Sequence, residues 1–187
     1  MTENFILQQK IDTNLCDRIY SVFKAHSSMS QGHVNKKDLG LIVDKTVKDS
    51  IEGTLNVDAD LTREYKLELQ KVVENYISKY PFCNFYSSWN IVEAINVQIY
   101  PPTGGYFKWH TERIGIKYGA NRHLVFMTYL NDVTDAGETE FFHQNLKVKP
   151  EKGLTLIWPS DWTYTHRGVA SPTQEKAIVT GWFEFTQ

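Results

Sequence analysis

The fold class is decided by one stretch of the chain, INVQIYPPTGGYFKWHTERIGIKYGANRHLVFMTYL, at residues 95–130. It contains runs rich in β-branched and aromatic residues, and clusters of Pro, Gly and Asn separate these runs. Short runs of this kind between turn residues are typical of strands in an antiparallel sheet. The expected strands are INVQIY (95–100), YFKWHTE (106–112), HLVFMTYL (123–130), ETEFF (138–142), GLTLIW (153–158) and KAIVTGWFEF (176–185).

The chain before this region has helical periodicity instead. In residues 14–26, apolar side chains recur every three to four positions, and Asn14 can cap the start. A longer apolar stripe runs through residues 60–80, where Asp60 can cap the helix and Pro81 stops it. We therefore expect two helices that support a β-rich core.

The segments between these helices and the strands are less regular. Residues 27–36 are predicted to be a polar loop, and residues 37–57 fit a helix or a strand equally well. The whole chain is predicted to be one α+β domain over 1–187. Residues 1–85 would be mainly helical support, and residues 86–187 an antiparallel β-sandwich or barrel.

Composition excludes several classes of protein. The 187 residues are 41% hydrophobic, 13% aromatic and 22% charged, which argues against disorder, collagen and coiled coil. Twenty Lys and Arg oppose 22 Asp and Glu, so the formal net charge is −2 and the chain has no general nucleic-acid footprint. The charge balance disfavours a nucleic-acid partner, although it leaves a local basic groove open.

The cysteines and the apolar runs indicate the compartment. A bridge between the two cysteines, Cys16 and Cys83, stays open, but reduced thiols in a reducing compartment are favoured. No apolar run approaches the 18 or so residues that a bilayer span needs, and the first residues lack a signal-peptide core. We expect a soluble cytoplasmic protein with no membrane partner.

Strand alternation places polar side chains on one face of two expected strands. Asn96, Gln98 and Tyr100 share a face of residues 95–100. Lys176 and Thr180 share a face of the last strand together with Ile178 and Trp182. A polar interior must be satisfied by its own hydrogen bonds or by a ligand.

One pair of side chains has metal-ligand spacing. His110 and Glu112 lie two residues apart, so on a strand both would point the same way. The pair is a weak signal alone, because most histidines lie at the surface or in hydrogen bonds. His166 would complete a two-His-one-carboxylate set, which suits an Fe(II) oxygenase, whereas zinc prefers a tetrahedral site.

Lys176 follows His166 by ten residues and is expected to point inward. An inward ammonium is costly unless it is paired. Its head could reach solvent, it could pair with Glu184, or it could bind an anionic co-substrate.

Residues from about 92 to 185 resemble the prolyl 4-hydroxylase-like branch of the Fe(II)/2-oxoglutarate-dependent dioxygenases, including phage-encoded members. The resemblance rests on the order and spacing of short motifs, none of which is specific alone. They are His110-Thr111-Glu112, Tyr129-Leu130-Asn131-Asp132, Gly137-Glu138-Thr139-Glu140-Phe141, Val148-Lys149-Pro150-Glu151-Lys152-Gly153, His166-Arg167-Gly168-Val169, Lys176 and Gly181-Trp182-Phe183.

The resemblance implies a double-stranded β-helix (jelly roll) with N-terminal supporting helices. It also implies hydroxylation of an unactivated C–H bond with Fe(II), 2-oxoglutarate and O2, with ascorbate as a candidate reductant. The leading substrate is a prolyl residue of a peptide or protein; another peptide side chain, a free amino acid or nucleic acid stays open. The implied roles are metal ligand for His110, Glu112 and His166; 2-oxoglutarate binding for Lys176, Tyr129, Tyr100, Thr139 and Thr180; and substrate contact for Trp182.

The chain departs from the usual family motif at Glu112, where relatives carry aspartate. Glutamate keeps the charge and the donor type but is one methylene longer, so the main chain must lie farther from the metal. A carboxylate at this position also argues against a halogenase, in which that ligand is lost.

The loop RIGIKYGAN at 113–121 leaves the expected ligand pair. Its glycines, Arg113 and Tyr118 suit a mobile lid that contacts substrate, although an ordinary hairpin connection fits nearly as well.

Two further alternatives are a binding module on the same jelly roll and a zinc hydrolase that uses the three ligands. A non-enzymatic binding module would have no reason to keep His110, Glu112, His166 and Lys176. A zinc hydrolase would leave Lys176 and Tyr129 without a role.

Overall fold

The computed structural model describes residues 3–36, 40–115 and 119–186. Its helices are α1 (Thr13–Ala25) and α2 (Ala59–Lys79), with short 3-10 turns η1 (Leu55–Val57), η2 (Pro81–Asn84) and η3 (Trp162–Tyr164). Its strands are β1 (Leu7–Lys10), β2 (Ser30–Gln31), β3 (Val34–Lys36), β4 (Gly40–Ile42), β5 (Ile51–Thr54), β6 (Trp89–Asn90), β7 (Asn96–Tyr100), β8 (Arg122–Tyr129), β9 (Thr139–Phe141), β10 (Leu146–Val148), β11 (Leu154–Pro159), β12 (His166–Gly168) and β13 (Lys176–Phe185).

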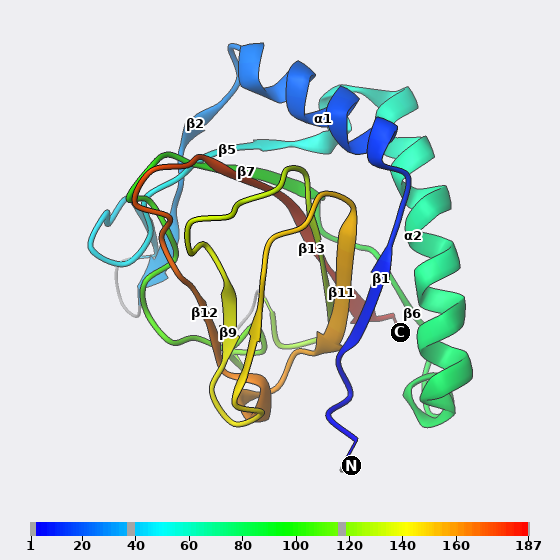
Figure 1. The fold of residues 1–187 in the computed structure, drawn as a ribbon. Coiled ribbons are helices and arrows are strands. Elements are labelled where there is room, and N and C mark those ends of the chain that lie inside the picture. The colour runs from blue at the N-terminus through cyan, green and yellow to red at the C-terminus, as the bar shows by residue number, and fades with distance from the viewer. Residues whose placement is uncertain (1–2, 37–39, 116–118, 187) are drawn as a thin grey trace.

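The strands form antiparallel sheets stacked against two helices (Figure 1). The large sheet has the order β1-β11-β8-β13-β7-β5-β2, and β6 also pairs with β13. A smaller sheet has the order β10-β9-β12, and β3 and β4 form a separate hairpin. The architecture is therefore mixed, with two helices and mainly antiparallel strands, as the sequence predicts for the fold class.

Both predicted helices form, but their caps differ from the prediction. The carboxylate of Asp12 accepts a hydrogen bond from the backbone N–H of Asn14 at 2.9 Å, and that of Asp58 accepts one from Leu61 N–H at 2.9 Å. The caps are thus not Asn14 and Asp60. A cap must precede the first helical residue with a non-helical backbone, and Asp58 has the required extended dihedral angles.

Five of the six expected strands are present as β7, β8, β9, β11 and β13. The prediction for residues 106–112 is wrong, because this segment makes only isolated bridges, from Tyr106 to Lys48 and from His110 to His166. Its pairing partner changes within four residues, so no continuous ladder can form. The polar loop predicted for 27–36 also contains β2 and β3.

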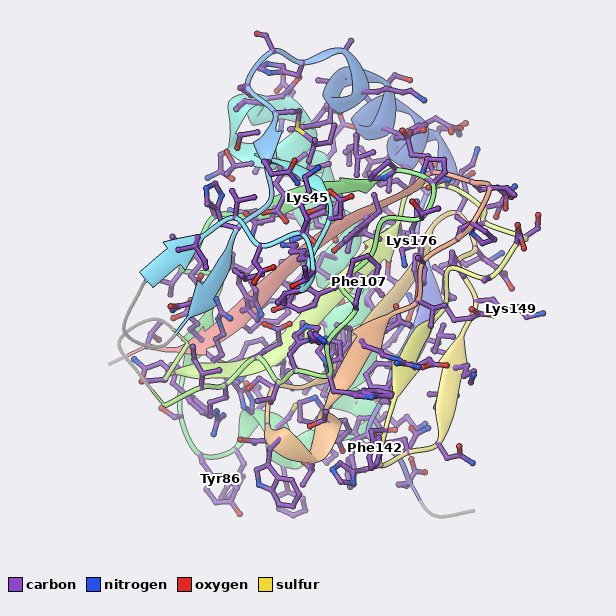
Figure 2. The ribbon with its side chains drawn as sticks, turned by 90° about the vertical axis from the view of Figure 1, so that its left-hand side faces the viewer. Lys45, Tyr86, Phe107, Phe142, Lys149 and Lys176 are labelled. Atoms are coloured by element: carbon purple, nitrogen blue, oxygen red, sulfur yellow. The ribbon has the colours of Figure 1, made fainter. Side chains whose placement is uncertain are left out.

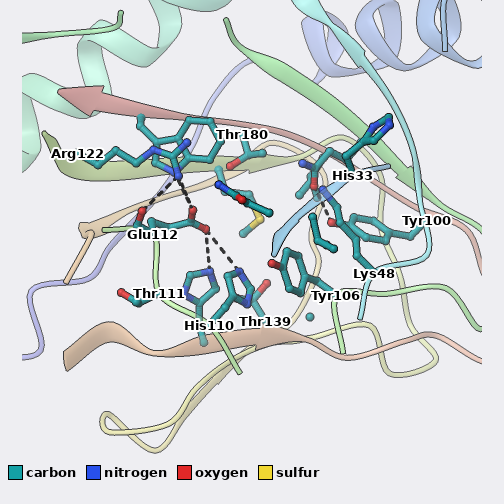
Figure 3. A pocket seen from close by; sticks show the side chains of 18 of the residues that line it. His33, Lys48, Tyr100, Tyr106, His110, Thr111, Glu112, Arg122, Thr139 and Thr180 are labelled. Atoms are coloured by element: carbon teal, nitrogen blue, oxygen red, sulfur yellow. Dashed lines mark hydrogen bonds and ion pairs between the residues drawn. The ribbon is translucent and has the colours of Figure 1, made fainter. Parts of the chain in front are cut away.

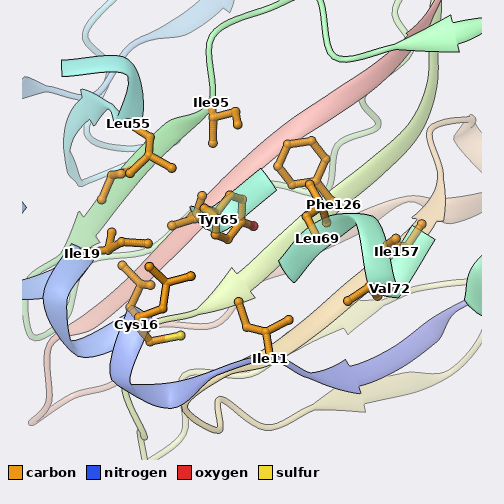
Figure 4. Close-up of a cluster of buried hydrophobic side chains, with 14 of the residues drawn as sticks. Ile11, Cys16, Ile19, Leu55, Tyr65, Leu69, Val72, Ile95, Phe126 and Ile157 are labelled. Carbon is orange, nitrogen blue, oxygen red and sulfur yellow. The ribbon is translucent and has the colours of Figure 1, made fainter. Parts of the chain in front are cut away.

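The two faces of the large sheet pack differently, as the alternation predicts. Val97, Ile99 and Val179 lie on the face that packs against α1 and α2, in a core that also holds Phe126 (Figure 4). On the opposite face, Tyr100, Met127, Tyr129 and Ile178 pack toward Phe141 and Val148 of the smaller sheet. One face of the large sheet therefore packs against the apolar core and the helices. The opposite face of the sheet is available to form a site.

Three buried hydroxyl groups in this core hydrogen-bond one another. The Tyr65 hydroxyl hydrogen-bonds Thr128 Oγ1 at 2.9 Å, and Thr128 Oγ1 hydrogen-bonds Thr155 Oγ1 at 2.7 Å. Cys16 and Cys83 are free thiols. Within the described residues, neither helix has the length and apolarity to cross a membrane.

Candidate metal centre

A cavity of about 480 Å³ lies between the large sheet and the smaller sheet. The polar faces of β7 and β13 line it, as do side chains from β8 and from the segment 106–112 (Figure 3). The β3–β4 hairpin adds a further wall with Val34, Asn35 and Leu41. The sequence did not indicate this wall, since residues 27–36 read as a polar loop.

His110, Glu112 and His166 converge inside this cavity. Glu112 Oε1 lies 3.5 Å from His110 Nε2 and 3.5 Å from His166 Nε2. Ligand atoms of the three residues lie within 4.8 Å of one another. Two imidazole nitrogens and one carboxylate oxygen on one side of a cavity are a donor set that fits Fe(II) and leaves coordination positions for other ligands.

Main-chain carbonyls orient both imidazoles. His110 Nδ1 lies 3.0 Å from Lys108 O, and His166 Nδ1 lies 3.0 Å from Tyr164 O. These contacts turn the Nε2 atom of each ring toward Glu112, and a ring proton on Nδ1 would leave the Nε2 lone pair for a metal. Burial, and next the neighbouring His166, lower the pKa of His110, which favours the neutral form that a metal needs.

The carboxylate is held in its ionised form. Burial opposes ionisation, but hydrogen bonds from His110 and His166 outweigh it and hold the pKa of Glu112 well below its ordinary value. The pKa shifts of His110 and Glu112 therefore favour the neutral imidazole and the ionised carboxylate that metal binding requires.

The second oxygen of Glu112 has its own partners. Glu112 Oε2 accepts hydrogen bonds from Trp182 Nε1 at 3.0 Å and from Arg122 NH1 at 3.2 Å. The Arg122 guanidinium lies 3.4 Å from the centroid of the Trp182 ring and pairs with both oxygens of Glu93. Oε1 alone therefore faces the two imidazoles. No local motif indicated Arg122 or Glu93, because each lies at least ten residues from Glu112.

Lys176 lies deeper in the same cavity with 4% of its surface exposed. Its Nζ donates to Gly137 O at 2.8 Å and to Val169 O at 3.0 Å. Among the described residues it has no carboxylate partner, so the pairing with Glu184 does not occur. Figure 2 shows Lys176 inside the molecule, whereas Lys149 extends from its edge. Burial lowers the pKa of Lys176 to about 8.

The other expected co-substrate residues also line the cavity; they are Tyr100, Tyr129, Thr139 and Thr180. The Tyr129 hydroxyl donates to Thr139 Oγ1 at 2.6 Å, and the Tyr100 hydroxyl donates to Gln98 Oε1 at 2.6 Å. Thr180 Oγ1 donates to Phe126 O at 3.0 Å, which leaves this hydroxyl no proton to give a ligand. The cavity thus has a buried cation at one end, with hydroxyl groups beside it.

The expected substrate residues differ in their placement. Trp182 lines the cavity. Arg113 does not line it: its Nε donates to Arg122 O at 2.7 Å and its NH1 pairs with Asp161 at 3.3 Å. Tyr118 lies outside the described residues. Sequence reasoning missed Tyr106, whose ring stacks on His110 at a centroid distance of 3.7 Å.

We predict that Glu112→Asp weakens metal binding. The shorter aspartate side chain cannot keep one carboxylate oxygen beside the imidazoles while the other oxygen reaches Trp182 and Arg122. Loss of such outer partners typically costs 10- to 100-fold in affinity, so we expect about a tenfold higher Kd for Co(II) in a spectroscopic titration. Glu151→Asp, at an exposed ion pair with Lys10, is the matched control. If Glu112→Asp bound Co(II) as tightly as the wild type or more tightly, the site would not require the longer glutamate side chain, and the prediction would be wrong.

Comparisons with known proteins relate this chain to 2OG-Fe(II) oxygenases. A family model described as the 2OG-Fe(II) oxygenase superfamily matches residues 95–184. No curated protein matches the sequence. The solved structures that the chain resembles include several prolyl hydroxylases at low identity, so that likeness concerns the fold.

Three of these structures span nearly the whole chain. A viral collagen prolyl hydroxylase of Paramecium bursaria Chlorella virus-1, in complex with 2OG, has 16% identity and a TM-score of 0.68, covering 98% of this chain and 97% of that one. A prolyl-4-hydroxylase of Pseudomonas putida has 16% identity and a TM-score of 0.71, covering 97% and 93%. A prolyl hydroxylase of Trichoplax adhaerens, in complex with a hypoxia inducible factor peptide fragment, has 16% identity and a TM-score of 0.73, covering 97% and 84%.

Proposed function

Because the chain belongs to the 2OG-Fe(II) oxygenase superfamily through residues 95–184, we propose that it hydroxylates a prolyl residue in a peptide or protein. The observation that carries the proposal is the convergence of His110, Glu112 and His166 in the cavity that also holds the buried Lys176. The prolyl preference is supported by the prolyl hydroxylases among the similar structures, one of them bound to a peptide.

The enzyme uses Fe(II), 2-oxoglutarate and O2. When bound, the metal and co-substrate supply the oxidising chemistry, in which 2-oxoglutarate is converted to succinate and CO2. In the proposal, the Nε2 atoms of His110 and His166 and Oε1 of Glu112 hold the metal. The Lys176 ammonium binds the distal carboxylate of 2-oxoglutarate, with Tyr129, Tyr100 and Thr139 completing that end of the pocket.

Apolar side chains also line this pocket. Trp158, Met127 and Ile178 give it apolar walls, which exclude water from the reacting groups. In the proposal, a prolyl side chain enters between Trp182 and the β3–β4 hairpin, because both line the cavity that holds the metal ligands. We propose further that the two facing sheets form a double-stranded β-helix within one domain, which residues 1–85 support.

The test uses the holoenzyme and defined peptides. Anaerobic Fe(II) and 2-oxoglutarate should first give a visible charge-transfer band, which reports the metal and co-substrate site alone. Proline-rich peptides should then stimulate succinate release and gain one oxygen atom by mass spectrometry, while peptides with alanine for proline should do neither. If the band forms but oxygen enters another residue or no peptide, the prolyl assignment fails while the oxygenase site stands.

A further inference from the structure

The metal-ligand histidines lie on chain segments that share little regular pairing. His110 belongs to no strand among the described residues, and it meets β12 in an isolated bridge with His166. The two residues exchange backbone hydrogen bonds of 3.0 Å in both directions, and Gly168 N–H donates to Tyr106 O at 2.9 Å. Because these few backbone hydrogen bonds are not part of a continuous ladder, side-chain contacts between the two segments can also set the separation of the imidazoles.

The register of the smaller sheet places the histidines in an inner row that faces the cavity. His166 is opposite Phe141 of β9, and Phe141 is opposite Leu146 of β10. His110 extends this row by one residue through its bridge with His166. In Figure 1, β9 and β12 lie next to each other on the side of the molecule away from α2.

The residues one position along make a second row, on the outer face of the same sheet. Lys147 is opposite Glu140, and Glu140 is opposite Arg167. The antiparallel bridge of His110 with His166 places Trp109 opposite Arg167. Because successive side chains point to opposite faces, this outer row of Lys147, Glu140, Arg167 and Trp109 lies directly behind the inner row.

The outer row is joined from end to end. Lys147 Nζ pairs with Glu140 Oε1 at 2.5 Å, and Arg167 Nε donates to Glu140 Oε2 at 2.7 Å. The Arg167 guanidinium lies 4.5 Å from the centroid of the Trp109 ring, a cation–π contact. Glu140 is 7% exposed, so its ion pairs are shielded from solvent more than ordinary surface pairs are.

We propose that the outer row is a clamp that sets the spacing of His110 and His166 from outside the cavity, with Arg167 as its central positioning residue. Arg167 touches neither donor nitrogen, yet it connects the segment that carries His110 to β12, which carries His166, and to β9. Trp109 is also fixed by edge-to-face packing on Phe142 at 5.3 Å. Loss of the clamp should let the His110 segment move away from β12 and should weaken metal binding.

The test measures the affinity for Co(II) alone, without 2-oxoglutarate or peptide, so it does not depend on the proposed prolyl substrate. Arg167→Met and Trp109→Ala should each raise the Kd for Co(II) about tenfold, the lower end of the effect of outer partners on metal affinity. The Kd of the double variant should be close to the larger of the two single-variant Kd values, because both changes break the same connection. Arg167→Lys should recover part of the affinity.

Arg18→Met is the matched control, because Arg18 forms an ion pair with Glu64 on the helical side of the molecule. It should change the Kd for Co(II) less than twofold. Circular dichroism checks that each variant is folded. If Arg167→Met or Trp109→Ala does not fold, Glu140→Gln replaces it and should raise the Kd at least threefold. A Kd within twofold of the wild type in the folded outer-row variants, or losses that multiply in the double variant, would overturn the clamp.

Discussion

Replacing His166 with alanine should abolish turnover and weaken Fe(II) binding by roughly a hundredfold or more, beyond the usual effect of an outer partner. His166 supplies one of the three donors in the cavity; the residue is 6% exposed, and Tyr164 O orients its imidazole. Water could fill its position, but the metal would lose a fixed nitrogen ligand. His110→Ala should have the same effect, because His110 Nε2 stands in the same relation to Glu112 Oε1.

The measurement is metal content after anaerobic reconstitution, together with succinate release. His143→Ala is the control, since His143 is exposed and does not line the cavity. Coupled turnover by His166→Ala with a full complement of iron would remove His166 from the ligand set and leave the proposed centre without its third donor.

Replacing Lys176 with methionine should raise the concentration of 2-oxoglutarate required for half-maximal rate by roughly a hundredfold. An ammonium has three donors, and only two are used, by Gly137 O and Val169 O. The third is available to a carboxylate in a buried site. Truncating one partner of such a charge pair costs about 2–5 kcal/mol, and about 1.4 kcal/mol corresponds to a factor of ten.

Methionine keeps the length and apolar character of the lysine stem, so the effect of charge is isolated from that of packing. Lys149→Met is the control, because Lys149 extends from the edge of the molecule (Figure 2). An unchanged dependence on 2-oxoglutarate in Lys176→Met would show that another group binds the distal carboxylate.

The same lysine predicts a pH dependence. Burial lowers the pKa of Lys176 to about 8, so in the free enzyme the ammonium loses its proton as the pH rises through this value. Affinity for 2-oxoglutarate should be constant well below pH 8 and fall about tenfold per pH unit above it. Lys176→Arg should remove this slope, since arginine stays charged throughout. Binding that is flat up to pH 10 in the wild type would contradict the role of the ammonium.

Stability should respond to this group in the opposite direction. The folded-state pKa is below the unfolded value, so between these two pKa values the unfolded chain binds more protons. The contribution of Lys176 to the free energy of unfolding therefore rises as the pH rises through that window. Denaturant unfolding of the wild type and Lys176→Met, compared at pH 7 and pH 9.5, separates this effect from that on binding.

Local patterns were enough to predict the supporting framework and much of the candidate site. The alternation in residues 95–100 placed Gln98 and Tyr100 on one polar face, and in the structure both line the cavity. The apolar stripe of residues 60–80 predicted α2. The spacing of His110 and Glu112, the candidate third ligand His166 and the inward Lys176 indicated residues that the fold gathers in one cavity.

Contacts between distant segments could not be predicted in this way. Segment 106–112 has strand-like composition, but its neighbours change from Lys48 to His166, so it forms no strand. The partners of Glu112 Oε2, Arg122 and Trp182, come from β8 and β13. Arg167 carries no local sign of its contact with Trp109.

The sequence by itself determined the helices, the faces of the strands and the residue types of the metal site, because side-chain periodicity follows from backbone geometry within one continuous segment. Only the tertiary structure decided which oxygen of Glu112 faces the imidazoles, how Lys176 is held and what lies behind the histidines. These features depend on the register between strands that are far apart in the chain, and register is a property of the assembled sheet that no single strand encodes.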